Sequence, residues 1–208
     1  NPGLLEDSVG TASLDAQNVV RLQLDAGQRG RHFQTALAQD VSNVAVDSLR
    51  PISGLTSPNS IGIDSSFTIE VLAHFDSLRP VGDQRAVLAS QASDPWSASL
   101  FSWAFAVERS GQGHARELGR LFRNTGGRRS RPRELELFVS NGNQIDRLNS
   151  GIRLKEKTDY FLCVVFDIKG IATFYAKNLE DGQVFTTEVA HSITQVNPVS
   201  YMNIAAPY

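Results

Sequence analysis

The sequence predicts an all-β protein built as a two-sheet antiparallel β-sandwich. Three observations support this: short segments with apolar residues at alternate positions, turn residues about every eight to twelve positions, and little sign of helix. The chain has 208 residues, which suits one sandwich domain of ordinary size, so residues 1–208 are interpreted as a single domain. A core of that size needs neither disulfides nor a metal to hold it together.

Residues 155–175 contain the clearest pair of strands. Apolar residues fill both alternating faces from Tyr160 to Phe166, which predicts an interior strand covered on both sides. A turn follows at residues 167–170, where Gly170 is free to adopt a positive φ angle, and a second strand runs on to Tyr175. Cys163 is the chain's one cysteine, so no internal disulfide can form, and we interpret it as a small buried hydrophobe.

The other strands follow from the same alternation of apolar and polar residues. Before residue 66 the pattern indicates short strands near residues 19–24 and 41–46. Further strands are predicted at residues 67–75, 85–90, 101–107, 135–139, 183–189 and 200–205. The side chains expected to share one core between the two sheets are Phe67, Ile69, Val71, Trp103, Phe105, Leu137, Leu162, Val164 and Phe166.

Three segments resemble laminin G-like, concanavalin A-like jelly-roll domains of bacterial type, a superfamily that includes lectins and glucanases. Residues 65–71 (SSFTIEV) are similar to its "sFTIEaWv" strand, and residues 7–10 (DSVG) to its early "D-s-s-G". Residues 154–175 resemble its central strand pair, with Asp167, Gly170 and Tyr175 at matching spacing. Tyr160 stands where the family usually has tryptophan, and the family's closing strand does not follow residue 205, so the last strand is either missing or replaced.

The resemblance implies a non-catalytic carbohydrate-binding or adhesion module of a larger, multidomain extracytoplasmic protein (secreted, periplasmic or on the cell surface). Two alternatives stay open: a glycoside hydrolase or other glycan-active enzyme of the same superfamily, and a structural spacer domain. No run of about 18 apolar residues predicts a transmembrane helix. The first residues lack the features of a secretory leader, so we expect a mature or trimmed fragment.

A basic segment or loop, residues 109–133, is the main lead to a ligand. Between Arg116 and Arg133 seven arginines face one acid, a balance of +6 that leaves −8 for the rest of a chain whose net charge is −2. Guanidinium groups bind sulfate, phosphate and carboxylate, so Arg128, Arg129 and Arg131 are predicted to hold a sulfated or otherwise anionic glycan. The alternative is that these arginines pair with the acidic remainder of the protein.

Two further observations bear on the ligand. Trp96 lies in a loop, where its indole either stacks on a sugar ring or packs down as a lid. Nucleic acid is not expected, because the sequence pI is about 6.1 and the aromatic residues near the arginines do not form a stacking series.

An active site has little support in the sequence. Glu134 and Glu136 resemble the start of the E-x-D-x-x-E strand of jelly-roll glucanases, but Phe138 or Val139 stands where the third acid belongs. A retaining glycosidase needs both a nucleophile and an acid, so the two glutamates are interpreted as solvated and dispensable for any activity. The chain also lacks a G-x-S-x-G elbow, a P-loop and a G-x-G-x-x-G motif.

A metal site is equally weakly indicated. The four histidines are scattered without ligand spacing. The resemblance admits one Ca²⁺ at the sandwich rim, for which Asp83 and Asp94 are the candidate ligands. Asp76 and Asp146 also fall in apparent loops, and for all four aspartates capping of a turn is the simpler role.

Overall fold

The computed structural model describes residues 65–75, 78, 86–92, 97–108 and 133–198 with their side chains. It gives the backbone alone for Arg85 and for strands β1 (Leu4–Glu6), β2 (Ser13–Gln17), β3 (Arg21–Gly27), β4 (Gly30–Gln34), β5 (Gly54–Thr56), β9 (Phe122–Asn124) and β15 (Met202–Ile204). The other elements are β6 (Phe67–His74), β7 (Arg85–Ala92), the 3₁₀ helix η1 (Ala98–Leu100), β8 (Phe101–Glu108), β10 (Glu134–Ser140), β11 (Ile145–Arg153), β12 (Asp159–Asp167), β13 (Ile171–Asn178) and β14 (Val184–Ala190).

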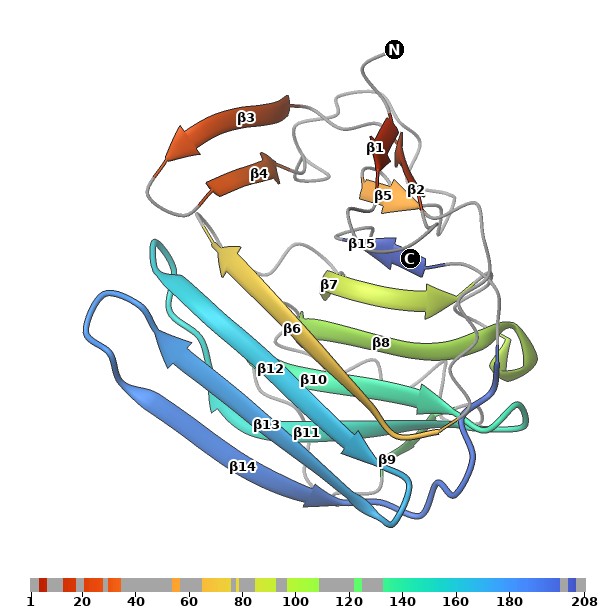
Figure 1. Ribbon diagram of the computed structural model, residues 1–208. Coiled ribbons are helices and arrows are strands. Elements are labelled where there is room, and N and C mark those ends of the chain that lie inside the picture. Colours follow the sequence, from red (N-terminus) through yellow and green to blue (C-terminus); the bar gives the residue numbers. More distant parts are fainter. Residues whose placement is uncertain are drawn as a thin grey trace.

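Two sheets lie face to face, as Figure 1 shows, which confirms the predicted all-β sandwich. The smaller sheet has the order β14-β13-β12-β6, and its pairs are all antiparallel. The larger has the order β1-β2-β5-β15-β7-β8-β10-β11-β9 and is antiparallel except where β9 runs parallel to β11. Strands β3 and β4 pair with each other. In the described part, no helix is long and apolar enough to span a membrane.

The β12–β13 hairpin forms as its sequence predicts. Its register runs without a shift from Tyr160 opposite Asn178 to Asp167 opposite Ile171. The N–H of Gly170 donates to the Asp167 carbonyl at 2.9 Å, and Gly170 has a φ of 113°, which residues with a side chain rarely adopt. Asp167 stabilises the turn by accepting hydrogen bonds from the Lys169 N–H and the Ser66 hydroxyl. The bond from Lys169 is the main reason that the pKa of Asp167 is lowered.

The predicted core forms between the two sheets. Trp103, Phe105, Leu137, Leu162, Val164 and Phe166 are buried in one cluster, and Phe67, Ile69 and Val71 pack against it while partly buried. Aromatic rings link the layers: the Phe67 ring lies 5.1 Å from that of Phe166 and 5.6 Å from that of Trp103. The Trp103 indole N–H donates to Gln91 Oε1 at 3.0 Å, so this buried donor is satisfied.

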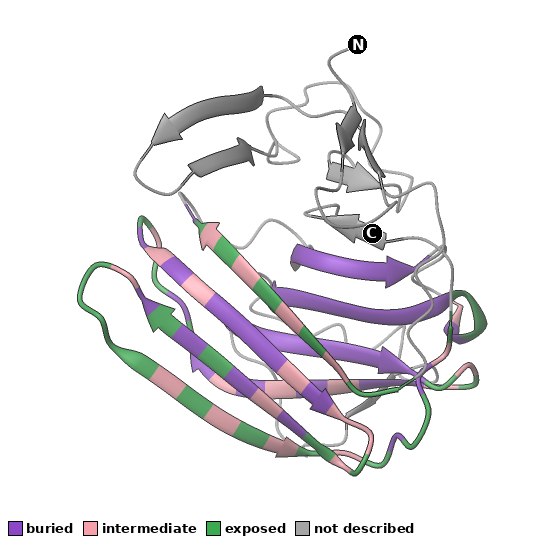
Figure 2. Ribbon diagram, in the orientation of Figure 1, coloured by how far each residue is buried: buried purple, intermediate pink, exposed green. Residues whose placement is uncertain are grey.

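The two sheets differ in how they are covered, as Figure 2 shows. Every residue of β8 and β10 is buried, and a second apolar cluster that includes Phe101, Ala104 and Phe138 lies on the side away from the main core. In β12 the outward-facing Phe161 and Val165 are only half-buried. The prediction that β12 is covered on both sides was therefore wrong for its outer face, because the doubly covered strands belong to the larger sheet.

Strand β11 was missed in the sequence because polar residues interrupt its apolar pattern. Its inward residues include Leu148 and Ile152, which join the main core. A tight turn precedes it, in which the Asn141 side chain accepts the N–H groups of Asn143 and Gln144 at 3.0 Å each. The last predicted strand appears as β15, which pairs with β7 and β5.

Truncating Phe166 tests the core. Because Phe166 is fully buried against Phe67 and His191, Phe166→Ala should lower the free energy of unfolding by about 3 to 5 kcal/mol. Chemical denaturation measures this, with Leu72→Ala as the control, since Leu72 is 61% exposed. Similar losses in the two variants would contradict the assigned core.

Candidate functional site

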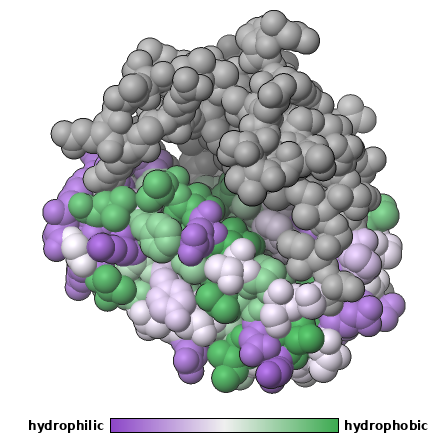
Figure 3. All heavy atoms as spheres, in the orientation of Figure 1, coloured by the Kyte–Doolittle hydropathy of each residue, from purple (hydrophilic) through white to green (hydrophobic). Residues whose placement is uncertain are grey.

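The smaller sheet leaves one face open, and this face is the candidate binding surface. Side chains alternate along a strand, so every second residue of β6, β12, β13 and β14 points away from the core. Several outward residues are apolar and exposed, namely Leu72, Ile171 and Val184. Figure 3 shows this face, where apolar residues lie interspersed with polar ones.

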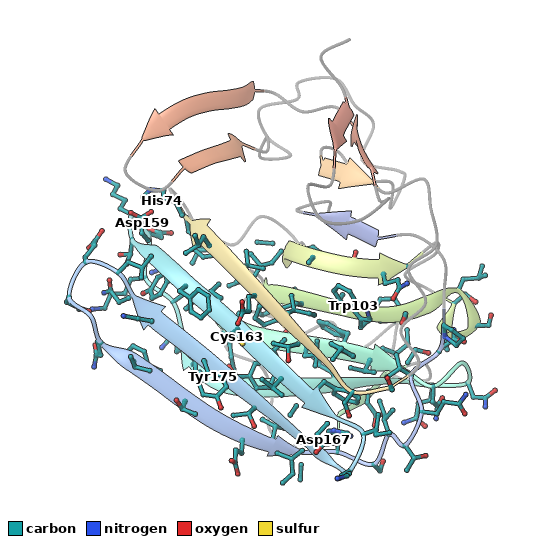
Figure 4. All side chains as sticks on the ribbon, in the orientation of Figure 1. His74, Trp103, Asp159, Cys163, Asp167 and Tyr175 are labelled. Atoms are coloured by element: carbon teal, nitrogen blue, oxygen red, sulfur yellow. The ribbon has the colours of Figure 1, made fainter. Side chains whose placement is uncertain are left out.

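Tyr175 lies near the middle of the open face. It stands on β13 opposite Cys163 on β12 and Thr186 on β14, and Cys163 in turn stands opposite Glu70 on β6. Figure 4 shows Tyr175 and Cys163 on these adjacent strands. Tyr175 is 36% exposed, so its ring offers an apolar surface and its hydroxyl a hydrogen-bonding group.

The residues around Tyr175 are both apolar and hydrogen-bonding. On one side, Phe161 stands between Leu72 and Lys177 in the strand register. On the other side, Thr173 stands opposite Glu188. Lys177, Glu188 and Glu70 are all exposed, so donors and acceptors of both charges surround the exposed ring.

A histidine–aspartate pair lies at one end of the open face. His74 Nδ1 lies 2.8 Å from Asp159 Oδ1, and Figure 4 shows the two side chains together where β6 ends and β12 begins. The side chains are 47% and 33% exposed, so water competes for this contact.

Cys163 is buried beneath the open face, as predicted, and is poorly suited to act as a nucleophile. Burial raises the pKa of its thiol, and the charge of Glu70 raises it further. A catalytic cysteine needs the opposite shift, from a cation or an adjacent base. Its neighbours across the strands are Glu70 and Tyr175, neither of which is a cation.

A charged cluster lies on the far side of the larger sheet and was not foreseen. Arg147 on β11 donates to Glu136 on β10 at 2.6 Å and also to Glu108 on β8. Both carboxylates are fully buried, and the Arg147 guanidinium lies 5.6 Å from the ring centre of Phe138. Neither Glu108 nor Arg147 belongs to a recognisable motif, and the strand register alone brings them together.

This cluster corrects the interpretation of Glu134 and Glu136 as solvated residues. Both are fully buried, and Glu134 Oε1 accepts the N–H of Gly151 at 2.6 Å. Glutamate alternating with leucine is typical of a strand with one face in solvent, but β10 is buried on both faces. Burial of these acids is tolerable because hydrogen bonds and a cation compensate for their lost hydration.

The site residues predicted from the sequence lie outside the described part of the chain. These are Trp96, Arg128, Arg129 and Arg131 for the glycan and Asp83 and Asp94 for Ca²⁺. They remain predictions. Of the seven arginines from Arg116 to Arg133, Arg133 is the one whose side chain the structure describes, and it pairs with Glu156 at 3.2 Å.

Of the two other aspartates expected in loops, Asp146 can be compared with the structure. Asp146 is buried within β11, not in a loop as predicted, and accepts a hydrogen bond from Gln144 at 2.6 Å. Asp76 lies outside the described residues. Among the described histidines, cysteines, aspartates and glutamates, no group of three or more is arranged to hold a metal ion.

His191 packs against the end of the core. Its ring stacks on Phe166 at 4.3 Å, and its Nδ1 accepts the N–H of Ile193 at 3.2 Å. Burial lowers the pKa of His191, although hydrogen bonding and the charges of Asp146 and Asp167 oppose that effect. The folded protein therefore favours the neutral ring.

Comparison with known proteins finds likeness only at the level of structure. No family model matches the chain, and no curated protein sequence does. A heptameric SAP-like pentraxin from Limulus polyphemus aligns with a TM-score of 0.41 and 12% identity, over 74% of this chain and 58% of its own. Lectin I from Ulex europaeus, solved with a methyl glycoside of α-L-fucose, aligns with a TM-score of 0.43 and 10% identity, over 98% of this chain and 88% of its own.

A further similar structure is winged bean acidic lectin in complex with methyl-α-D-galactose, with a TM-score of 0.40 and 12% identity over 99% of this chain and 88% of the lectin. The chain spans little more than half of the pentraxin's length. The laminin G-like and bacterial assignments stay predictions.

Arg147 should be essential to the stability of the larger sheet. Arg147→Met removes the cation shared by two buried carboxylates, which should cost about 3 to 5 kcal/mol of unfolding free energy. Adding Glu108→Gln and Glu136→Gln should recover much of that loss. The control is Arg133→Met, whose partly exposed pair should be worth at most about 1 kcal/mol. Equal effects of Arg147→Met and Arg133→Met would contradict a buried network.

His191 should make stability depend on pH. Since its folded pKa lies below the ordinary value of about 6.5, the unfolded chain binds the proton more readily. The stabilisation is complete above about pH 6.5 and is lost as pH falls toward the folded pKa. Unfolding free energies measured across this window should fall more steeply for the parent protein than for His191→Gln, and identical slopes would contradict the assignment.

Proposed function

We propose that this chain is a non-catalytic carbohydrate-binding or adhesion module, and that the open face of the smaller sheet is its binding surface. One observation carries the proposal: Tyr175 is exposed at the middle of a regular sheet face and is surrounded by hydrogen-bonding side chains. A sugar ring has an apolar C–H face that packs on an aromatic ring, and hydroxyl groups around its edge that need polar partners. Tyr175 and its neighbours offer both.

The charges of the open face favour a neutral sugar. Around Tyr175 the charged residues are Glu70, Glu188 and Lys177, two acids against one base, a local balance of −1. Such a surface repels a polyanion slightly, but its carboxylates accept hydrogen bonds from sugar hydroxyls. A sulfated glycan would instead need the arginine segment.

The Arg147 cluster gives no support to a glycosidase site. Glu108 and Glu136 are fully buried, and both contact the Arg147 guanidinium on the side of the larger sheet away from the main core. We therefore assign these carboxylates to the packing of the sheet, in keeping with the proposed non-catalytic role.

The remaining features of the proposal rest on the sequence. Arg128, Arg129 and Arg131 form a second candidate surface, for anionic glycans, with Trp96 as a stacking residue and Asp83 and Asp94 as candidate Ca²⁺ ligands. The family resemblance supports an extracytoplasmic setting within a larger protein with neighbouring domains.

Removing the Tyr175 ring should weaken binding without unfolding the protein. On a neutral glycan identified by array screening, Tyr175→Ala should reduce affinity about tenfold, which corresponds to about 1.4 kcal/mol of lost stacking. Isothermal titration calorimetry gives the affinity, and thermal unfolding should change little because Tyr175 is exposed. The matched control is Leu100→Ala, an exposed apolar residue on η1 outside this face.

Other outcomes would point to the alternatives. If Tyr175→Ala binds as the parent does while Arg128→Ser, Arg129→Ser and Arg131→Ser together abolish retention, the ligand site is the arginine segment. Release of reducing ends that stops with Glu136→Gln would establish a hydrolase. An array without any bound glycan would favour a structural spacer.

A further inference from the structure

Strand β14 forms an edge of the smaller sheet. Of the strands that the structure describes, β13 is the one that pairs with it, and Figure 1 shows β14 at the outer margin of the sheet. An edge strand presents backbone N–H and C=O groups that a further strand can use. The sequence of β14 is VFTTEVA, and the register with β13 runs without a bulge.

The hydrogen bonds at the two ends of β14 show which backbone groups face outward. The Asn178 N–H donates to the Gln183 carbonyl, and the His191 N–H donates to the Gly170 carbonyl, both at 2.9 Å. Bonded pairs alternate along an antiparallel ladder, so the odd-numbered residues of β14 bond to β13. The even-numbered residues therefore direct their N–H and C=O groups away from the sheet, and these are Val184, Thr186, Glu188 and Ala190.

Natural edge strands usually carry features that prevent pairing, such as lysine, proline, a bulge or an inward-pointing charge. Strand β14 has no lysine, proline or bulge, and its one charge, Glu188, points to solvent. Its composition of valine, phenylalanine and threonine also favours the extended conformation. It is thus well suited to receive another strand.

We infer that β14 pairs with β14 of a second copy of this chain, antiparallel about a two-fold axis at Thr187. This register makes Val184 face the partner's Ala190 and Thr186 face the partner's Glu188, so outward backbone groups meet outward backbone groups. Phe185 then faces the partner's Val189, and Thr187 faces its own copy. Two four-stranded sheets would join into one of eight strands (four from each copy), with about eight new backbone hydrogen bonds.

An alternative register is less favourable. An axis at Glu188 would place the two Glu188 carboxylates directly opposite each other, which is repulsive. An axis at Thr187 keeps like charges apart and matches apolar with apolar residues. Because pairing along one edge buries less than the roughly 1,200 Å² of a stable interface, the dimer should be weak and depend on concentration.

Sedimentation velocity between about 1 μM and about 1 mM tests the inference, and the parent chain should shift from monomer to dimer within this range. Thr186→Pro removes an outward N–H but no bond to β13, so it should fold normally and weaken dimerisation at least tenfold. The matched control, Thr186→Val, keeps the backbone donor and should dimerise as the parent does. A parent that stays monomeric throughout, or Thr186→Pro that dimerises equally well, would overturn the inference.

Cross-linking tests the register independently of the proline variant. Across the two-fold axis, two Thr187→Cys residues should lie about 4.5 Å apart at their Cα atoms, close enough for a disulfide. Glu188→Cys residues would face the partner's Thr186 and lie diagonally at more than about 7 Å, beyond that reach. Oxidation should therefore give a covalent dimer with Thr187→Cys but not with Glu188→Cys, whereas the reverse result would reject the register.

Discussion

The packing of aromatic side chains between the two sheets is the interaction on which the structure depends. Phe67 and Phe166 from the smaller sheet meet Trp103 from the larger sheet, with ring centres 5.1 and 5.6 Å from that of Phe67. Each ring stands on a strand whose register is fixed by its neighbours, so this contact also sets which residues face away from the core. A slip of one residue in β12 would turn Phe166 outward and Cys163 inward.

This constraint leaves the two sheets with different surroundings. Strands β8 and β10 of the larger sheet are buried on both faces, and the second face holds three glutamates together with apolar residues and Arg147 from β11. Such a network is costly to disrupt and stabilises the sheet. The smaller sheet has one free face, where Tyr175, polar side chains and exposed apolar residues lie within reach of a ligand. The proposed binding role of the open face and the structural role of the buried cluster both rest on this difference between the two sheets.

Alternation of apolar residues was sufficient to predict the fold class, the core and the β12–β13 turn, because these depend on local periodicity and on one glycine. It was not sufficient for the charged cluster, since Glu108 and Arg147 are distant in sequence and meet through the register of three strands. Alternation also assigned Glu134 and Glu136 to solvent, because a sequence does not show whether the second face of a sheet is covered. Tyr175 was recognised as part of a strand, but its exposure depends on the open side of that sheet.

The most direct measurement of the central claim is a two-dimensional NMR titration of the ¹⁵N-labelled chain with a bound neutral glycan. Amide shifts should change along the open face, at Tyr175, Thr186, Lys177 and Glu70, while those near Arg147 and Glu136 stay constant. Shifts concentrated around Arg147 and Glu136, with the amides of the open face unchanged, would contradict the account.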